Sequence, residues 1–129
     1  MAYLKPQFFV AKVFNKVAMK TGVGGSEIFT VTGRSTGRPQ RIPVIPLDHD
    51  GARYIVSTRG ESQWVQNVRA NPTVTIAGKG GSREYHATEV PTSASAPIIS
   101  AYRAKAGKTV EAYWKQLPNA EDHPVFLLV

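Results

Sequence analysis

The first apolar pattern along the chain has the spacing of a helix. Over residues 5–20 the apolar positions recur every three or four residues, which predicts an amphipathic helix. These positions are Phe9, Val10, Val13, Phe14 and Val17, and the lysines of the polar side are Lys5, Lys12, Lys16 and Lys20. A basic helix of this kind can lie on an anionic membrane surface, but we favour packing against the rest of the domain. The glycine-rich residues 21–26 then form a joint.

Beyond this joint, most apolar segments are short and typical of β-strands. The six predicted strands are EIFTVT, RIPVIPL, ARYIVS, TVTIAG, REYHATEV and HPVFLLV. Asp50-Gly51 predicts a tight hairpin turn between the second and third strands, because this dipeptide is a strong signal for such turns. Gly80-Gly81 joins the fourth strand to the fifth.

Three more helices are expected among the strands. The segment GESQWVQNVRANP has apolar residues at helical spacing and ends at Asn71-Pro72. The next helix is TSASAPIISAYRAKAGK, for which we expect Ser95 as the N-cap, Pro97 near the first turn and Gly107 at the end. A short helix in TVEAYWKQL follows it.

The order of these elements predicts an α+β fold with a mainly antiparallel sheet. Hairpin connections pair neighbouring strands antiparallel, and about six short strands suit a closed or partly closed barrel, which leaves few unpaired edges. We expect a single domain over residues 1–129, in which residues 1–25 are the N-terminal helix and joint.

The composition narrows the functional classes. The chain has no cysteine, which excludes disulfides and thiolate chemistry, and no apolar run approaches the roughly 18 residues of a membrane span. We therefore expect a cytoplasmic monomer, with peripheral contact at the inner face of the membrane as the alternative for the basic helix. The net charge of +7, from 16 Lys and Arg against 9 Asp and Glu, indicates either a polyanionic partner or simply a soluble basic surface.

Positive charge is concentrated in the connection between the first two predicted strands. Gly33 and Gly37 can adopt positive φ there, which lets backbone N–H groups turn toward a single anion. The cations of this connection are Arg34, Arg38 and Arg41, and its hydroxyl donors are Ser35 and Thr36. Arginine binds phosphate and carboxylate oxygens in pairs, so the pattern favours a ligand with several anionic oxygens over a merely solvated loop.

No other part of the chain has a recognisable chemical pattern. His49, His86 and His123 are too far apart to predict a metal site, so we expect none. There is no nucleophile motif and no pair of acids suited to glycoside hydrolysis. Redox or group-transfer chemistry would therefore come from a bound cofactor.

Three blocks together resemble the deazaflavin-dependent nitroreductase family, which comprises reductases of quinones and enones that use reduced coenzyme F420. The blocks are TGRSTGRPQRIPV, YIVSTRGESQWVQNVRANPTVTI and the closing HPVF, and the match covers Glu27 to Val129. The resemblance implies a split β-barrel related to pyridoxamine phosphate oxidases and to other barrels that bind flavin mononucleotide. It also implies hydride transfer from reduced F420 to a quinone, enone, unsaturated lactone or nitro compound.

The resemblance assigns a site for the cofactor as well. The phosphate and anionic tail of F420 would lie against Arg34, Ser35, Thr36, Arg38 and Arg41. Many members have lysine at the position of Ser35, so Arg38 and Arg41 carry more of the charge here. The ring would lie between two walls, one of Pro43 and Val44, and the other of Val56, Ser57, Thr58 and Arg59.

The remaining implied residues would enclose the ring and the substrate. Ser57 and Thr58 would donate hydrogen bonds to the pyrimidine edge of the ring, and Trp64 and Asn67 would close over the cofactor. Tyr102, Tyr113 and Trp114 would cover the substrate side, with Tyr102 or water delivering a proton. For Trp64 and Trp114, packing in the core is the alternative.

Two other functions remain open from the sequence. A split barrel that binds flavin mononucleotide would also use the arginines, although a single phosphate needs fewer of them. A non-catalytic protein that stores a cofactor or binds nucleic acid is the other possibility, but nucleic acid needs a wider basic face, and we expect no such partner.

Overall fold

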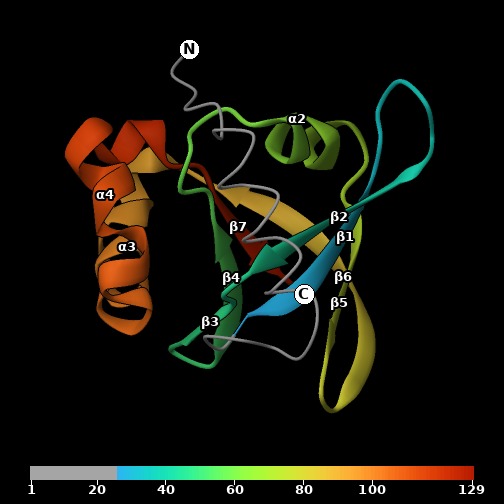
Figure 1. Ribbon diagram of the computed structural model, residues 1–129, viewed down its shortest axis with the longest axis horizontal. Helices are drawn as coiled ribbons and strands as arrows, with labels where there is room; N and C mark the ends of the chain where they lie inside the picture. Colours follow the sequence, from blue (N-terminus) through green and yellow to red (C-terminus); the bar gives the residue numbers. More distant parts are fainter. Residues whose placement is uncertain (1–25) are drawn as a thin grey trace.

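Residues 26–129 are described by the computed structural model, and their seven strands form one curled antiparallel sheet (Figure 1). The strands are β1 (Glu27–Thr32), β2 (Pro39–Val44), β3 (Leu47–His49), β4 (Ala52–Val56), β5 (Thr73–Gly78), β6 (Gly81–Val90) and β7 (Val125–Leu128). The helices are α2 (Gln63–Ala70), α3 (Thr92–Ala106) and α4 (Lys108–Gln116), followed by a 3₁₀ turn, η2 (Ala120–Asp122). The predicted antiparallel sheet is confirmed, whereas the helix predicted over residues 5–20 and its possible membrane contact lie outside the described residues.

The strand order is β2-β1-β5-β6-β7-β4-β3, so the last strand of the chain lies inside the sheet. The first part of β6 pairs with β5, and its last four residues pair with β7. On its other edge β7 pairs with β4. The long strand β6 therefore connects the β2-β1-β5 part of the sheet to the β7-β4-β3 part.

One predicted strand, RIPVIPL, is in fact two. β2 ends at Val44 and pairs with β1, whereas β3 begins at Leu47 and pairs with β4. Between them lies Pro46, which has no N–H to donate to a neighbouring strand. The sheet therefore has seven strands rather than about six, because the chain changes partners at this break.

The predicted turn at Asp50-Gly51 is confirmed. Asp50 has φ of 50° and Gly51 has φ of 78°, and they connect β3 to β4. Two consecutive positive φ values define the turn whose twist suits a two-residue hairpin.

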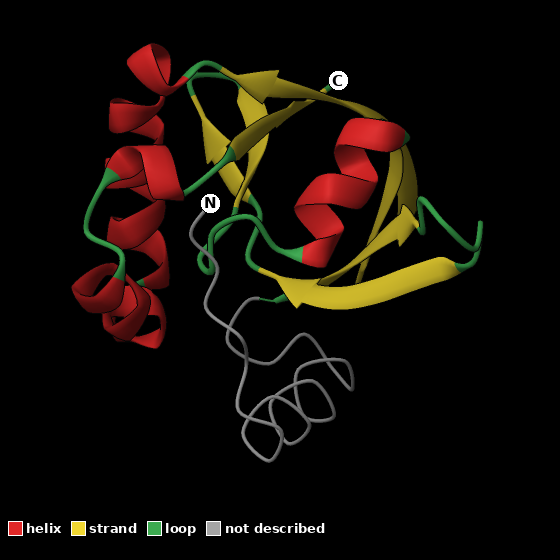
Figure 2. Cartoon of the chain, turned by 90° about the horizontal axis from the view of Figure 1, so that it is seen from above, coloured by secondary structure: helices red, strands yellow, loops and turns green. Residues whose placement is uncertain are grey.

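The barrel core lies inside the curl, where α2 packs against the concave side of the sheet (Figure 2). Trp64 of α2 is 7% exposed and contacts Phe29 edge-to-face at 5.3 Å and Phe126 at 5.7 Å between ring centroids. The other buried members are Val31, Ile55, Val65, Val68, Val74, Ile76, Tyr85, Ala87 and Leu128. Aromatic contacts of this kind add to the apolar burial that holds α2 in place.

A second core lies between the sheet and the pair α3 and α4, which stand together on one side of the molecule (Figure 2). Its buried residues are Leu47, Val56, Ile98, Ile99, Tyr102, Val110, Trp114 and Val125. Alternate residues of β4 and β7 therefore face different cores, which explains why the sequence of these strands is almost continuously apolar. None of the helices between residues 26 and 129 combines the length and apolarity needed to span a membrane.

The boundaries of α3 correct one detail of the sequence interpretation. The helix begins at Thr92 rather than after Ser95, and the Ser95 hydroxyl donates to the Thr92 carbonyl oxygen at 3.0 Å. The predicted N-cap role of Ser95 is therefore wrong. The predicted end at Gly107 is confirmed, where φ of 60° breaks the helix before α4.

An ion-pair network ties the end of α2 to the sheet. Arg69 donates to both carboxylate oxygens of Glu89 on β6, through Nε and Nη2 at 2.8 Å each. It also bonds to Glu61, which precedes α2. The hydrogen bonds that Arg69 donates to Glu89 contribute most to the raised pKa of Arg69, against the opposing effect of burial. Two-oxygen contacts of this kind also fix the orientation of the arginine.

We predict that Arg69→Ala lowers the free energy of unfolding by about 1 kcal/mol, because it leaves two carboxylates without their shared cation at a partly exposed position. The free energy of unfolding of Arg69→Lys should lie between those of Arg69→Ala and the wild type, since lysine cannot bind both carboxylates as a fork. Urea denaturation at low and high salt measures the difference, which should shrink at high salt. Lys79→Ala, at an exposed turn, is the control; a loss as large as that for Arg69→Ala would contradict the network's role.

Candidate functional site

The arginine-rich connection between β1 and β2 is an ordered turn, which we call the arginine loop (residues 33–38). Gly33 N–H donates to the Arg38 carbonyl oxygen at 2.8 Å, and Gly37 N–H donates to the Gly33 carbonyl oxygen at 2.9 Å. Gly37 has φ of 70°, and a Cβ at Gly33 would lie 2.9 Å from Thr36 Oγ1. Both positions therefore require glycine, for conformation at Gly37 and for space at Gly33.

Arg34 is the cation that fastens the arginine loop to α2. Its Nη1 donates to Asn67 Oδ1 at 2.8 Å, and its Nη2 donates to Gln63 Oε1 at 2.8 Å. The backbone N–H of Arg34 donates to the same Asn67 oxygen at 3.0 Å. Arg34 and Asn67, which the resemblance assigned separately to the cofactor, are thus in contact with each other.

Three arginines have no such partner. All eight arginines of the chain lie in the described part. Carboxylates bind Arg53, Arg69 and Arg103, amides bind Arg34, and Arg83 lies over the ring of Tyr85. Among residues 26–129 no hydrogen-bond or ion-pair partner is found for the guanidinium group of Arg38, Arg41 or Arg59. These three belong to the predicted cofactor site, which therefore holds the uncommitted arginine charge of the described chain.

The backbone of the arginine loop also offers donors. Within residues 26–129, the N–H groups of Ser35 and Thr36 have no hydrogen-bond acceptor, and both residues are exposed. Arg38 N–H instead donates to Thr36 Oγ1 at 3.1 Å. The loop therefore has free N–H groups at its tip and an unpaired guanidinium at Arg38, a combination suited to anionic oxygens.

The wall predicted on β2 divides between two faces of the strand. Ile42 and Val44 pack against the barrel core, and the pairing of Ile42 with Phe29 places this face inward. Arg41 and Pro43 alternate with them and so lie on the outer face. Pro43 thus lies about 7 Å along the strand from Arg41, while Val44 supports the strand from inside.

The second predicted wall follows β4. Val56 is 6% exposed and belongs to the second core. Ser57 is also buried, and its N–H donates to the Pro124 carbonyl oxygen at 2.8 Å while its hydroxyl donates to that of Gly60 at 2.6 Å. Both donors of Ser57 are therefore used within the protein, which corrects the expectation that they face the cofactor. Thr58 and Arg59 are half-buried and remain available.

His123 contacts the same segment through the backbone of Ser57. Its Nδ1 lies 2.8 Å from the Ser57 carbonyl oxygen, and its Nε2 lies 2.6 Å from that of Leu117. The imidazole is 1% exposed and stacks on Trp114 at 4.0 Å between centroids. It therefore links the segment after β4 to the end of α4.

Trp64 and Asn67 both lie on α2 but contact different parts of the structure. Trp64 lies in the barrel core, which is the packing alternative for this residue, and its closing over a cofactor stays a prediction. Asn67 is 6% exposed and faces the arginine loop through Arg34. Its Nδ2 donates to Gln40 Oε1 on β2 at 2.8 Å.

The predicted substrate side lies in and around the second core. Tyr102 is 4% exposed, and its ring centroid is 6.0 Å from that of Trp114, which is also buried. Burial, reinforced by Tyr113, raises the pKa of the Tyr102 hydroxyl. A weaker acid at a buried position is poorly suited to donate a proton. Tyr113 is half-buried and Trp114 has the packing role.

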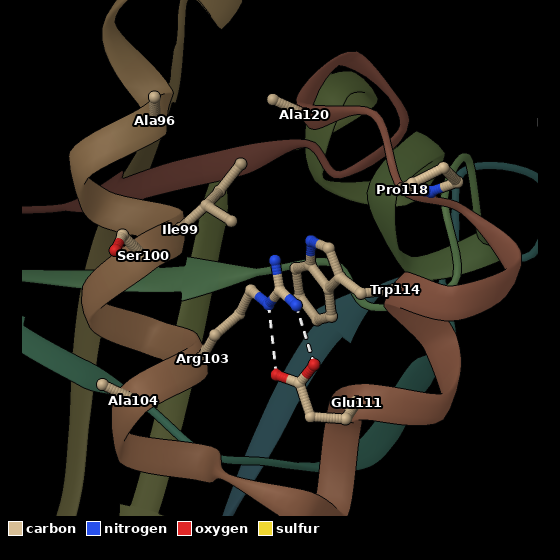
Figure 3. A pocket seen from close by; sticks show the side chains of 9 residues that line it. All are labelled: Ala96, Ile99, Ser100, Arg103, Ala104, Glu111, Trp114, Pro118 and Ala120. Carbon is tan, nitrogen blue, oxygen red and sulfur yellow. Dashed lines mark hydrogen bonds and ion pairs between the residues drawn. The ribbon is translucent and has the colours of Figure 1, made fainter.

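A pocket of about 450 Å³ opens between α3 and α4 (Figure 3). Its polar edge is the Arg103–Glu111 ion pair, with contacts of 2.7 Å and 3.1 Å, and the hydrogen bonds from Arg103 contribute most to a lowered pKa of Glu111. Arg103 also lies 5.2 Å from the centre of the Trp114 ring. The other lining residues are Ala96, Ile99, Ser100, Ala104, Pro118 and Ala120. None of the predicted cofactor residues lines this pocket.

Sequence reasoning missed the polar partners of the arginine loop. Gln40 occupies an inward position in the alternation Gln40, Ile42, Val44, and a polar residue at such a position signals a specific partner. Gln63 and Asn67 are four residues apart, so they share one face of α2. Nothing in the sequence indicated that Arg34 would bind both. Among residues 26–129, no cluster of three His, Asp or Glu side chains could hold a metal ion.

Comparison with known proteins identifies a family and a fold. The family model of the F420H(2)-dependent quinone reductases matches residues 10–122. A search among curated proteins found no match. Among solved structures, an F420-H2 dependent reductase (FDR-A) is 22% identical, with 81% of this chain and 93% of that chain covered and a TM-score of 0.58.

Two further solved structures share the fold. A Listeria innocua protein assigned as a pyridoxamine 5′-phosphate oxidase is 16% identical, with 81% of this chain and 82% of that chain covered and a TM-score of 0.56. HutZ, a heme storage protein from Vibrio cholerae, is 12% identical, with 80% and 79% covered and a TM-score of 0.59. The predicted split β-barrel is therefore confirmed.

We predict that Gly37→Ala lowers the free energy of unfolding by about 1 kcal/mol, because a Cβ is strained at positive φ. Gly37→Asn should cost less, since asparagine tolerates this region better. Gly80→Ala is the matched control, at a position with open space and no positive φ. Chemical denaturation of the three variants compares them, and equal stability of both alanine variants would show that the loop conformation is unimportant.

Proposed function

The chain belongs to the F420H(2)-dependent quinone reductase family, and on this premise we propose that it reduces an electrophilic, conjugated small molecule with hydride from reduced F420. It is thus an F420-dependent oxidoreductase. The observation that supports the assignment of the site is the set of three uncommitted arginines, Arg38, Arg41 and Arg59, in a chain whose other arginines all have partners. We infer that this charge is kept for the cofactor.

The arginine loop fits the anionic part of F420. The cofactor carries a phosphodiester and a γ-linked glutamate tail, so it presents several anionic oxygens at one end. Arg38 and Arg41 are exposed and unpaired, and the N–H groups of Ser35 and Thr36 are free beside them. We assign the tail to these groups, since charge-assisted hydrogen bonds are stronger than neutral ones.

We place the deazaflavin ring between the outer face of β2 at Pro43 and the segment Thr58–Arg59. Pro43 offers an apolar surface on the same face as Arg41, and Thr58 and Arg59 supply donors that the protein does not itself use. When bound, the reduced ring supplies the hydride from its C5 position. Ser57 and His123 act here by fixing the backbone of this wall.

The acceptor class is a quinone, enone, unsaturated lactone or nitro compound, each of which has a carbon or nitrogen centre that accepts hydride. The protein's contribution is orientation of two reactants, which can account for a large part of the rate enhancement. The proton that follows is best assigned to water, because Tyr102 is buried and its pKa is raised. Tyr113, which is half-buried, remains the residue of α4 available to contact the acceptor.

We predict that the protein binds F420 at least about tenfold more tightly than flavin mononucleotide, which has one phosphate and no anionic tail. Fluorescence titration of both cofactors measures the two dissociation constants. Turnover is then followed by reappearance of oxidised F420 in the presence of a soluble quinone, an enone, an unsaturated lactone and a nitroaromatic compound. Tighter binding of flavin mononucleotide would replace the proposal with a flavin enzyme, and F420 binding without turnover of any acceptor would favour a carrier.

We also predict that replacing Arg38 and Arg41 together by alanine raises the dissociation constant for F420 by roughly tenfold to a hundredfold, because two charge-assisted contacts at a wet site are lost. The salt dependence of binding should become shallower, and kcat at saturating F420 should change little because these residues are assigned to the tail and not to the reacting carbon of the ring. The control removes two exposed charges elsewhere, in Lys79→Ala with Lys108→Ala. An equal loss in the control would mean that overall charge, and not this loop, attracts the cofactor.

A further inference from the structure

We propose that Asn67 is a positioning residue whose side-chain amide clamps both ends of the arginine loop and so directs Arg38 and Arg41 toward the anionic ligand. This inference rests on the proposed function for the identity of the ligand. The clamp itself is a matter of contacts within the protein, and it can be tested without any cofactor.

The contacts of Asn67 reach the loop on both sides. Its Oδ1 accepts from the backbone N–H and from Nη1 of Arg34, at 3.0 Å and 2.8 Å, where the loop begins. Its Nδ2 donates at 2.8 Å to Gln40 Oε1, two residues beyond the end of the loop. A single buried side chain on α2 therefore fixes where the loop leaves β1 and where it enters β2.

The chemistry of this clamp requires a side-chain amide. One end of the amide must accept two hydrogen bonds and the other must donate one, and asparagine provides both functions on a short side chain. Because Asn67 is 6% exposed, losing a partner would leave a buried polar group unpaired, which is unfavourable. The three bonds therefore make one loop position preferred over others.

These hydrogen bonds also leave Asn67 with little capacity to bind a ligand. Both lone pairs of Oδ1 are used by Arg34, and one of the two Nδ2 hydrogens is used by Gln40. A single N–H remains on a side chain with little exposed surface. Asn67 is thus better suited to holding the loop than to binding the cofactor directly.

The clamp gives Arg34 a different role from Arg38 and Arg41. Arg34 directs its guanidinium at Asn67 and Gln63, so its charge is directed to α2. The guanidinium groups of Arg38, at the end of the loop, and of Arg41, on β2, have no partners among the described residues. Holding such a turn before the ligand arrives removes part of the ordering cost of binding.

The first test follows amide hydrogen exchange in the full chain without cofactor. In Asn67→Ala, exchange of the Arg34 amide should become at least about tenfold faster, because its acceptor is gone. Amides of the β5–β6 turn should keep their wild-type rates. Asn71→Ala is the matched control, since Asn71 is on the same segment and accepts only from Thr73 N–H at 3.3 Å. Asn67→Asp should keep the Arg34 amide protected, because the carboxylate still accepts. An unchanged Arg34 amide in Asn67→Ala would overturn the clamp.

The second test measures F420 binding over a range of salt concentrations. Asn67→Ala should raise the dissociation constant by roughly tenfold while the dependence on salt stays as in the wild type, because no charge has been removed. Replacing Arg38 and Arg41 should instead reduce that dependence, so the two roles are separable. A shallower salt dependence in Asn67→Ala, or an unchanged dissociation constant, would overturn the positioning role. If the wild type fails to bind F420, the proposed function fails, and the exchange experiment still decides whether the clamp exists.

Discussion

The two cores of the structure share β4 and β7, which contribute buried side chains from both faces of the sheet. Ile55 and Phe126 face the barrel core, whereas Val56 and Val125 face the core beneath α3 and α4. Since β7 comes from the end of the chain and lies between β4 and β6, neither core is complete until the last residues are in place. The two halves of the molecule therefore share one sheet and are expected to gain stability together rather than separately.

The candidate site takes its geometry from the barrel core through α2. The apolar face of this short helix is fixed by Trp64 against aromatic residues of β1 and β7. Its neighbouring polar residues, Gln63 and Asn67, are positioned as a result, and they determine where the arginine loop lies. A tryptophan buried in the barrel core thus influences the placement of the exposed arginine loop.

The sequence allowed prediction of most elements and of the fold, because apolar periodicity and turn signals such as Asp50-Gly51 are local. It did not reveal the break between β2 and β3, since RIPVIPL is apolar from Ile42 to Leu47 and the change of partner depends on distant strands. The start of α3 was also misplaced, because Ser95 has a residue type that suits an N-cap but lies inside the helix.

The candidate site shows the same division between local and distant information. The concentration of arginine in one loop was visible in the sequence, and Arg38 and Arg41 are uncommitted in the structure. The commitment of Arg34 to Asn67 joins positions 33 residues apart, and the hydrogen bond from the Ser57 N–H to the Pro124 carbonyl oxygen depends on how the chain returns to β7. Such contacts are set by tertiary packing, and no local pattern encodes them.

The exposed positions of Arg38 and Arg41 have a consequence for selectivity. Point charges at the rim of a site accelerate the encounter with any anion, and this steering acts over a distance set by the ionic strength. Exposed guanidinium groups on long side chains can also follow carboxylates at different separations. Under the proposed assignment of the tail, the loop should accept tails with different numbers of glutamates. Under the proposed placement of the ring, discrimination among anionic molecules then falls to the wall of Pro43, Thr58 and Arg59, where shape acts together with charge.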